Sequence, residues 1–307
     1  MTGPSAFFCA DLSRQISESS CGTASIGDVW LLLEYSAAWE RKAVEDSALS
    51  ANVKAFLSDV IKTIPRARVL LIKSDRVRKR DLTFYVARSI ENAPLLVKIP
   101  LTNYEQLMDL EIASIATGES NSCGEKVSGP LFLVCTHGRR DKCCAKFGYP
   151  LYKALSRSNE EAIWQSSHVG GDRFAANLVC LPHGLFYAHV TEESGHKIIE
   201  EYRSGRVVLE NYRGRACYSH PAQAAECFVR HETGIEGVDD LQYVGTERTG
   251  ETIWRVTFRY GSVGALYEAT VRSRESEVKT YITCDATEQK SVTEFVLEKF
   301  RTIRHTS

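Results

Sequence analysis

The stretch PLFLVCTHGRRDKCCAKFGYPLYKALSR, residues 130–157, indicates the fold of this chain more clearly than any other. Its first part, PLFLVC (130–135), is an apolar run typical of a buried strand, and residues 143–157 predict a helix broken near Pro150. A polar loop joins the two. Because this loop follows the carboxyl end of a strand, it is expected at the sheet edge where α/β proteins bind ligands.

The elements that follow complete a recognisable order. We predict a strand, a two-strand hairpin and a helix at 162–168, 177–182 with 185–190, and 196–205. The order strand, helix, strand, hairpin, helix is that of a thioredoxin-like α/β unit, in which helices pack on a central mixed sheet.

The first half of the chain repeats this order. Its expected strands and helices lie at 29–35, 48–64, 68–74, 82–89, 94–100 and 103–115. The segment 118–130 is rich in Gly, Ser and Asn, so it predicts a link between two units. We therefore expect a tandem pair of thioredoxin-like halves, although the halves share little residue identity.

The last part of the chain predicts a small α+β appendage. A helix is expected over 220–234, followed by the alternating strands LQYVGTE, TIWRVTFRY and GALYEATVRS. We expect no ligand cluster in this part. Arg213, Arg215 and Arg230 are expected on solvated faces, with nucleic-acid binding as the less favoured alternative.

Composition narrows the class of protein. Lys plus Arg number 38 against 39 Asp plus Glu, so charge favours neither a nucleic-acid partner nor a membrane surface. The N-terminal residues MTGPSAFFCADLSRQ lack the features of an export signal, and a cytoplasmic protein is expected. Most of the ten cysteines should then be reduced, with Cys180 and Cys227 packed as buried thiols.

The polar loop and a second loop carry potential metal donors. Cys135 and Cys144 can converge if the loop between them folds back, which Gly138 would assist. His168 and Asp172 flank two glycines in HVGGD, where the backbone could pass close to a bulky inorganic group. Four donors would suit either a four-coordinate zinc ion or a two-iron cluster.

Three segments of the chain resemble the sucrase/ferredoxin-like family. They are CTHGRRDKCCAKFG, WQSSHVGGDRFAANLVCLPHGLFY and YRGRACY. The resemblance is specific between about 131 and 217, looser towards the N-terminus, and fades after about 235. It implies a thioredoxin-like ferredoxin domain with a [2Fe–2S] cluster, held by two cysteines and by two histidines in an H-x-G-G-H motif.

Carried over by residue, the resemblance assigns Cys135, Cys144 and His168 as ligands. The position of the second histidine holds Asp172, so three alternatives remain for the fourth ligand: Asp172 first, Cys143 second, or an exogenous group. Histidine ligands raise the potential of such a cluster, and an anionic Asp172 would lower it again, so an intermediate potential is expected.

The expected organisation is a ligand-free thioredoxin-like half over 1–125, the [2Fe–2S] ferredoxin domain over 126–215 and the appendage over 216–307. The expected function is electron transfer with a protein partner docked on the basic loop, which contains Arg139 and Arg140. Two alternatives stay open: a metal-free thiol redox protein using Cys143 or Cys144, and a structural zinc module.

Four further residues are expected to support the site. His137 is expected to support the loop, Arg173 to anchor it, and Trp164 and Phe174 to keep the site dry. Nothing in the sequence indicates glycosidase chemistry.

Overall fold

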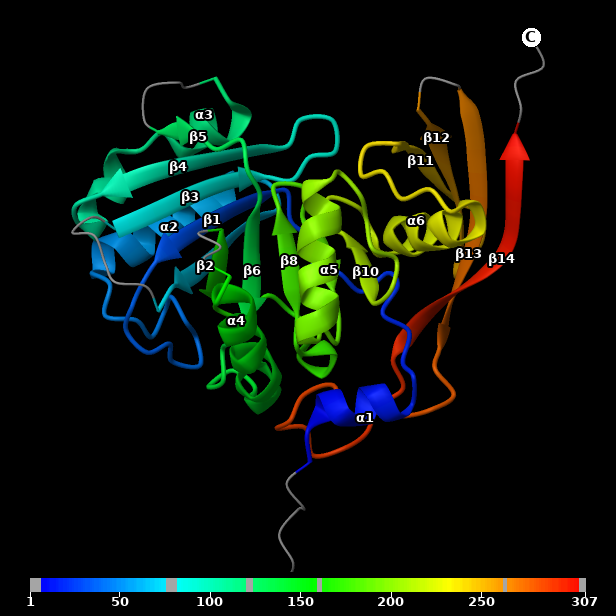
Figure 1. The fold of residues 1–307 in the computed structure, drawn as a ribbon, viewed down its shortest axis with the longest axis horizontal. Helices are drawn as coiled ribbons and strands as arrows, with labels where there is room; N and C mark the ends of the chain where they lie inside the picture. Colours follow the sequence, from blue (N-terminus) through cyan, green and yellow to red (C-terminus); the bar gives the residue numbers. More distant parts are fainter. Residues whose placement is uncertain (1–6, 76–81, 120–123, 159–161, 262–263, 304–307) are drawn as a thin grey trace, which may run out of the picture.

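A ten-stranded mixed sheet forms the body of the molecule, and a separate four-stranded antiparallel sheet lies beside it (Figure 1). The computed structural model describes residues 7–75, 82–119, 124–158, 162–261 and 264–303. The large sheet has the strand order β10-β9-β8-β6-β7-β2-β1-β3-β4-β5. The chain is therefore a mixed α/β protein.

The first half of the large sheet is built around a buried central strand. Its elements are β1 (Val29–Glu34), α2 (Ala51–Thr63), β2 (Ala67–Lys73), β3 (Leu82–Arg88), β4 (Leu95–Leu101), η1 (Tyr104–Asp109), α3 (Ile112–Thr117) and β5 (Glu125–Lys126). Strand β1 is parallel to β2 and antiparallel to β3. The single helix expected over 103–115 is divided, because Leu110 has an extended backbone with φ −92° and ψ 127°. Of the predicted link, residues 120–123 lie outside the described residues.

The second half contains β6 (Leu131–Cys135), η2 (Cys144–Gly148), α4 (Tyr149–Ser156), β7 (Ile163–Ser166), η3 (Asp172–Phe174), β8 (Leu178–Leu181), β9 (Leu185–Tyr187), α5 (Glu192–Arg203) and β10 (Tyr212–Arg215). Here β6 is parallel to β7 and antiparallel to β8. The expected break near Pro150 is a change from a wide π-type turn to α-helix at Tyr149. Pro150 lies in the first turn of α4, where its missing N–H is tolerated.

The two halves share one strand order. It is β2-β1-β3-β4 in the first half and β7-β6-β8-β9 in the second. Strands β2 and β7 pair antiparallel and so join the halves into one sheet. Helices α4 and α5 lie on the near side of the sheet in Figure 1.

The C-terminal part is one helix packed on four strands: α6 (His220–Thr233), β11 (Leu241–Arg248), β12 (Ile253–Tyr260), β13 (Ala265–Glu275) and β14 (Thr293–Ile303). The buried apolar residues of α6 and of β11 to β13 form one core. The helix and three strands were predicted. The sequence pattern missed β14, because this strand is largely exposed and carries little apolar alternation.

Three arginines were placed wrongly by sequence. Arg213, Arg215 and Arg230 are buried, so they are neither solvated nor free to bind nucleic acid. Arg230 pairs with Glu226 at 3.0 Å inside α6, and Arg213 donates to the Asn177 side chain at 2.7 Å. These buried partners stabilise charges that would otherwise be costly to bury.

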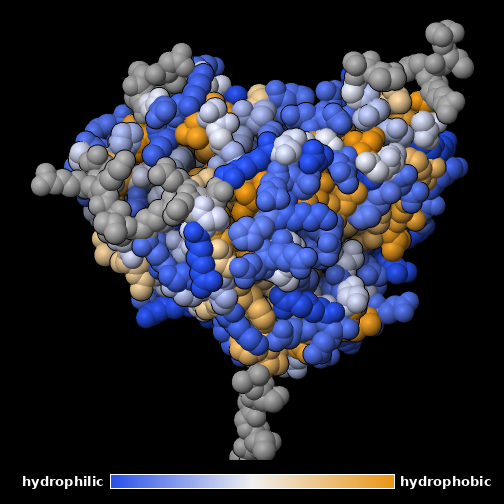
Figure 2. All heavy atoms as spheres, viewed as in Figure 1, coloured by the Kyte–Doolittle hydropathy of each residue, from blue (hydrophilic) through white to orange (hydrophobic). Residues whose placement is uncertain are grey.

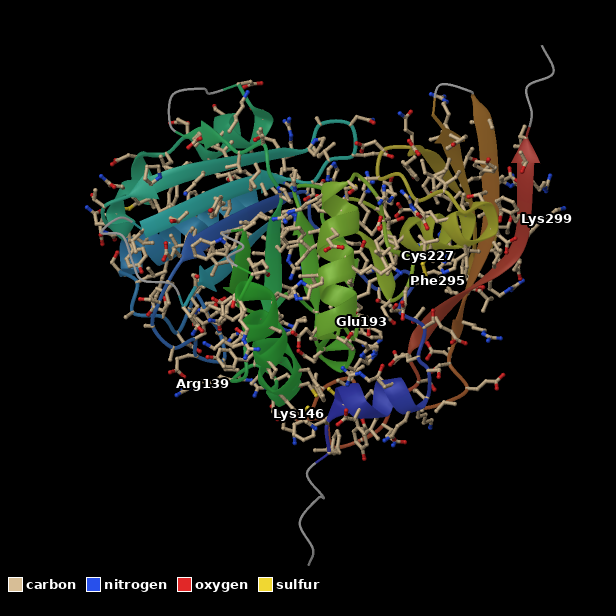
Figure 3. The ribbon with its side chains drawn as sticks, in the orientation of Figure 1. Arg139, Lys146, Glu193, Cys227, Phe295 and Lys299 are labelled. Atoms are coloured by element: carbon tan, nitrogen blue, oxygen red, sulfur yellow. A yellow bond between two sulfur atoms is a disulfide. The ribbon has the colours of Figure 1, made fainter. Side chains whose placement is uncertain are left out.

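The N-terminal segment also departs from expectation. Helix α1 (Cys9–Gln15) was not predicted, and it packs against η3. Cys21 forms a disulfide with Cys227 of α6, 206 positions away, and Figure 3 labels Cys227 on that helix. Cys227 is buried as expected, but the prediction that it is a free thiol is wrong. Cys180 is a buried free thiol, as predicted.

The surface viewed in Figure 2 is mostly hydrophilic, with hydrophobic residues scattered over it. Among the described residues, none of the helices combines the length and apolar character that a membrane span requires.

Candidate metal centre

The two loops singled out by sequence meet at one edge of the large sheet. Strand β6 ends at Cys135 and η2 begins at Cys144, while His168 follows β7, which is parallel to β6. The ligand atoms of Cys135, Cys144 and His168 all lie within 4.8 Å of one another. The predicted convergence of these three residues is therefore observed.

Asp172 lies beside these three residues, but outside the group whose ligand atoms are all within 4.8 Å of one another. Its Oδ1 lies 3.6 Å from Cys144 Sγ and 3.1 Å from His168 Nδ1. The approach to His168 lacks hydrogen-bond geometry, so Nδ1 is a buried nitrogen without a hydrogen bond among the described residues. A buried ring nitrogen that makes no hydrogen bond is free to coordinate a metal.

The first loop is held in its folded-back shape by its own backbone. The Asp141 N–H donates to the His137 carbonyl at 3.2 Å, and the Cys144 N–H donates to the Asp141 carbonyl at 3.0 Å. A Cβ at Gly138 would lie 2.6 Å from the Cβ of Ala145, so this glycine permits the close return of the loop. The role predicted for Gly138 is confirmed.

The glycines of the second loop allow close contacts with other parts of the chain. Gly170 and Gly171 have φ +97° and +83°, which favour glycine. A Cβ at Gly170 would lie 2.2 Å from Ser25 Oγ, and one at Gly171 would lie 2.5 Å from the Arg213 guanidinium. The close neighbours of these glycines in the structure are Ser25 and Arg213, and an inorganic group near this backbone stays a prediction. The glycines let the loop pack on Arg213 and the N-terminal segment.

Two neighbouring residues orient the loops. His137 Nε2 donates to the Glu40 carbonyl at 2.7 Å, and its Nδ1 accepts from the His168 N–H at 3.2 Å. Only the neutral ring with hydrogen on Nε2 satisfies both contacts, and burial lowers the pKa of His137 in agreement. Arg173 pairs with Glu18 at 2.5 Å. Both residues thus have the supporting roles predicted for them.

The centre is dry except at His168. Cys135 and Cys144 are buried in one core cluster with Trp164, and Phe174 is buried in η3, the short helix that begins at Asp172. The Asp172 side chain is 6% exposed, whereas that of His168 is 23% exposed. His168 also lines a pocket of about 260 Å³, together with Val44, Leu57, Ile61 and other residues. The imidazole is the part of this group that solvent or a partner can approach.

Burial and contacts between neighbouring side chains shift the pKa values of these residues. A hydrogen bond between the two thiols lowers the pKa of Cys135 and raises that of Cys144. Burial raises the pKa of Asp172 to about 6. Burial alone would lower the pKa of His168, but contacts with Cys135 and Asp172 raise it overall. Two buried sulfurs and one ring nitrogen, with a carboxylate oxygen beside them, form a donor set that suits a metal centre.

A second group of donors lies next to the first, and sequence analysis missed it. It consists of Cys9, Asp141, Cys143 and Cys284, all buried. Cys143 Sγ lies 3.6 Å from Cys9 Sγ and 3.1 Å from Cys284 Sγ, so the structure places it in this group and not beside Cys144. The C-terminal region, where no ligand cluster was expected, contributes one residue, Cys284, to this group. No spacing rule links residues so far apart in sequence.

Comparison with known proteins agrees with the geometry of the first group. A family model described as sucrase/ferredoxin-like matches residues 20–214, which is more than half of the 307-residue chain. No curated protein and no solved structure matches the chain significantly. The matched range includes both loops of the first donor group, and the chain belongs to the sucrase/ferredoxin-like family.

Proposed function

We propose that this protein transfers electrons through a [2Fe–2S] cluster held by Cys135, Cys144, His168 and Asp172. The observation that carries the proposal is the convergence of Cys135, Cys144 and His168 at the ends of the parallel strands β6 and β7. Asp172 Oδ1 lies 3.1 Å from His168 Nδ1 and 3.6 Å from Cys144 Sγ, next to these three. The family membership supports the proposal, and the strand order β7-β6-β8-β9 supports a thioredoxin-like ferredoxin half.

The surrounding residues prepare the site for such a group. When bound, the cluster supplies one-electron exchange. His137 fixes the backbone of His168, and the folded-back loop fixes Cys144. Trp164 packs in the same buried cluster as Cys135 and Cys144, which excludes water from the thiols. Burial of both Cys143 and Cys144 weighs against the thiol redox alternative, since a reacting thiol needs contact with its substrate.

We infer that a redox partner approaches at His168. This side chain is partly exposed and lines a pocket whose wall is mostly apolar. Arg139 and Arg140 are exposed on the first loop, and Arg139, labelled in Figure 3, pairs with Glu40. Arg140 then offers positive charge to an acidic partner. Electron transfer to an anionic acceptor should slow as salt increases, and Arg140→Gln should weaken this salt dependence.

Metal analysis of the anaerobically purified full chain tests the assignment. About two irons and acid-labile sulfide per chain are expected, with an EPR signal on reduction. Cys135→Ala should lose the iron. Cys180→Ala is the matched control, because Cys180 is equally buried but belongs to neither donor group, and it should keep the iron. A protein without iron after reconstitution would contradict the proposal.

The fourth ligand can be tested by substitution. Asp172→His should keep the cluster and raise its midpoint potential, because a neutral imidazole replaces an anionic oxygen. Asp172→Ala should alter the EPR spectrum. Identical spectra and potentials for the wild type and both variants would exclude Asp172 as a ligand.

A second candidate is a single four-coordinate metal ion in this group. The spacing of the three ligand atoms within 4.8 Å favours it, since each iron of a two-iron cluster binds its own ligand pair. Iron and sulfide would then be absent from the wild type, and zinc would depend on Cys135.

A further inference from the structure

We propose that Cys9, Cys143, Cys284 and Asp141 form a second metal site, and that this site binds zinc and ties both ends of the chain to the first donor group. The three cysteines come from α1, from the loop before η2 and from the segment between β13 and β14. Figure 1 shows α1 lying against that last segment. Cys9 and Cys284 lie outside the range matched by the family model.

The distances suit a tetrahedral ion. The three sulfur atoms form a triangle with sides of 3.6, 3.1 and 3.6 Å. In tetrahedral zinc coordination the sulfurs are about 3.8 Å apart, because each Zn–S bond is about 2.3 Å. Two sides of the triangle therefore need to lengthen by about 0.2 Å, and the Cys143–Cys284 side by about 0.7 Å. Both carboxylate oxygens of Asp141 lie 4.0 Å from Cys9 Sγ, and one of them lies within 4.8 Å of all three sulfurs.

The donor set is closed and already oriented. The Asp141 carboxylate accepts the Cys143 N–H at 2.8 Å and the Cys284 N–H at 2.7 Å, which fixes it between two of the thiols. The Ala10 N–H points at Cys143 Sγ at 3.4 Å. Four protein ligands with no open position are the pattern of a structural zinc site, and second contacts of this kind hold its ligands in place.

The surroundings exclude water and balance charge. The aromatic rings of Phe7, Phe8, Phe147 and Tyr281 pack around the thiols. Zinc with three thiolates and one carboxylate has a net charge of about −2. Lys146 lies 3.6 Å above the Phe8 ring, and Lys142 lies 5.2 Å from it, so two cations flank the site. Thiolate ligands of this softness select zinc over magnesium or calcium.

The site has a structural consequence. Cys143 directly precedes Cys144 of the first donor group, so a zinc ion on Cys143 would anchor that loop to residues from both ends of the chain. Binding releases the thiol protons, and its free energy adds to the stability of the folded state.

Zinc analysis and X-ray absorption on the full chain test the proposal. Wild type grown with zinc should hold about one zinc per chain, with three sulfurs at about 2.3 Å and one oxygen in its zinc shell. Cys9→Ala and Cys284→Ala should lose the zinc, whereas Cys180→Ala and Cys135→Ala should keep it. X-ray absorption on the wild type tests the ligand set directly, so the test does not depend on whether a variant folds.

Different failures can be told apart. A wild type without zinc, a Cys9–Cys284 or Cys143–Cys284 disulfide in the native protein, or iron in place of zinc on these cysteines would overturn the proposal. Zinc lost from Cys135→Ala but kept in Cys284→Ala would also overturn it, and would reject the iron assignment of the first group as well. Loss of iron from Cys135→Ala with zinc retained would support both.

Discussion

His189 shows how the pKa of one side chain responds to burial and to nearby arginines. Its ring packs edge-on against Phe174, with centroids 5.7 Å apart, and its Nε2 lies 3.3 Å from Ser13 Oγ. Burial lowers the pKa of His189 to about 4, and the nearby positive charges of Arg14 and Arg213 act in the same direction. The folded protein therefore holds this imidazole neutral.

We expect His189 to make the protein sensitive to acid. An unfolded histidine binds a proton near pH 6.5, whereas the folded one does so near pH 4, so the unfolded state binds more protons between these values. Stability should fall through this window as pH decreases, by on the order of 2 kcal/mol from this residue. Urea unfolding at pH 7 and pH 4.5 should show a smaller acid loss in His189→Gln than in wild type.

The control for this measurement is His196→Gln, a substitution of a histidine on α5. Its acid loss should equal that of wild type. If His189→Gln loses as much stability as wild type over the same pH range, the folded protein does not hold His189 neutral.

At the scale of elements, the junction between β2 and β7 is short. The two strands pair through Ile72 with Ser166 and Lys73 with Gln165. Ser167 extends the junction, because its N–H donates to the Leu71 carbonyl at 2.7 Å and its Oγ accepts the Leu71 N–H at 3.0 Å. A side-chain oxygen thus replaces a strand carbonyl where the halves meet.

Removal of that oxygen should weaken the junction. Ser167→Ala leaves the Leu71 N–H buried without an acceptor, and we expect a loss of about 1–3 kcal/mol in the free energy of unfolding. Ser166→Ala is the matched control, since the buried Ser166 hydroxyl has no hydrogen-bond partner among the described residues. Its effect should be near zero. Chemical denaturation measures the free energy of unfolding of both variants. Equal losses in the two variants would show that the Ser167 contact does not stabilise the junction.

At the scale of the whole molecule, the C-terminal module is tied to the N-terminal segment. The disulfide between Cys21 and Cys227 spans 206 positions, and Arg66 donates to the Cys217 carbonyl at 2.8 Å near the same boundary. Long closed loops restrict the unfolded chain most, so this link constrains the module against the large sheet.

Opening the disulfide should lower stability. For a loop of this length the chain-entropy model gives about 5 kcal/mol, which is an upper value because strain and residual structure reduce it. Cys227→Ala and Cys21→Ala should lower the melting temperature by similar amounts, and the double variant should add little to either. Strictly additive losses, or two alkylatable thiols at these positions in the native protein, would show that the link does not form.

Sequence reasoning identified most local elements and the three residues of the first donor group, but not the second donor group. The predicted strands and helices from 29 to 275 largely match the structure, because buried strands and amphipathic helices leave periodic patterns in short windows. Cys135, Cys144 and His168 were found because each lies next to a strand or helix end in two short, recognisable loops.

The features that depend on contacts between residues far apart in sequence were missed or predicted wrongly. Strand β14 is exposed, and the partners that bury Arg213 come from Thr23 and Asn177, far away in sequence. The Cys21–Cys227 link joins segments for which no spacing rule exists.

The sequence by itself determined the alternation of strands and helices and the residues of the first donor group, since both are local properties of the chain. Only the tertiary structure decided that Cys143 turns away from Cys144 to meet Cys9 and Cys284, residues from opposite ends of the chain. The physical reason is that a local pattern records which residues are buried, but their partners are set by how separate elements pack.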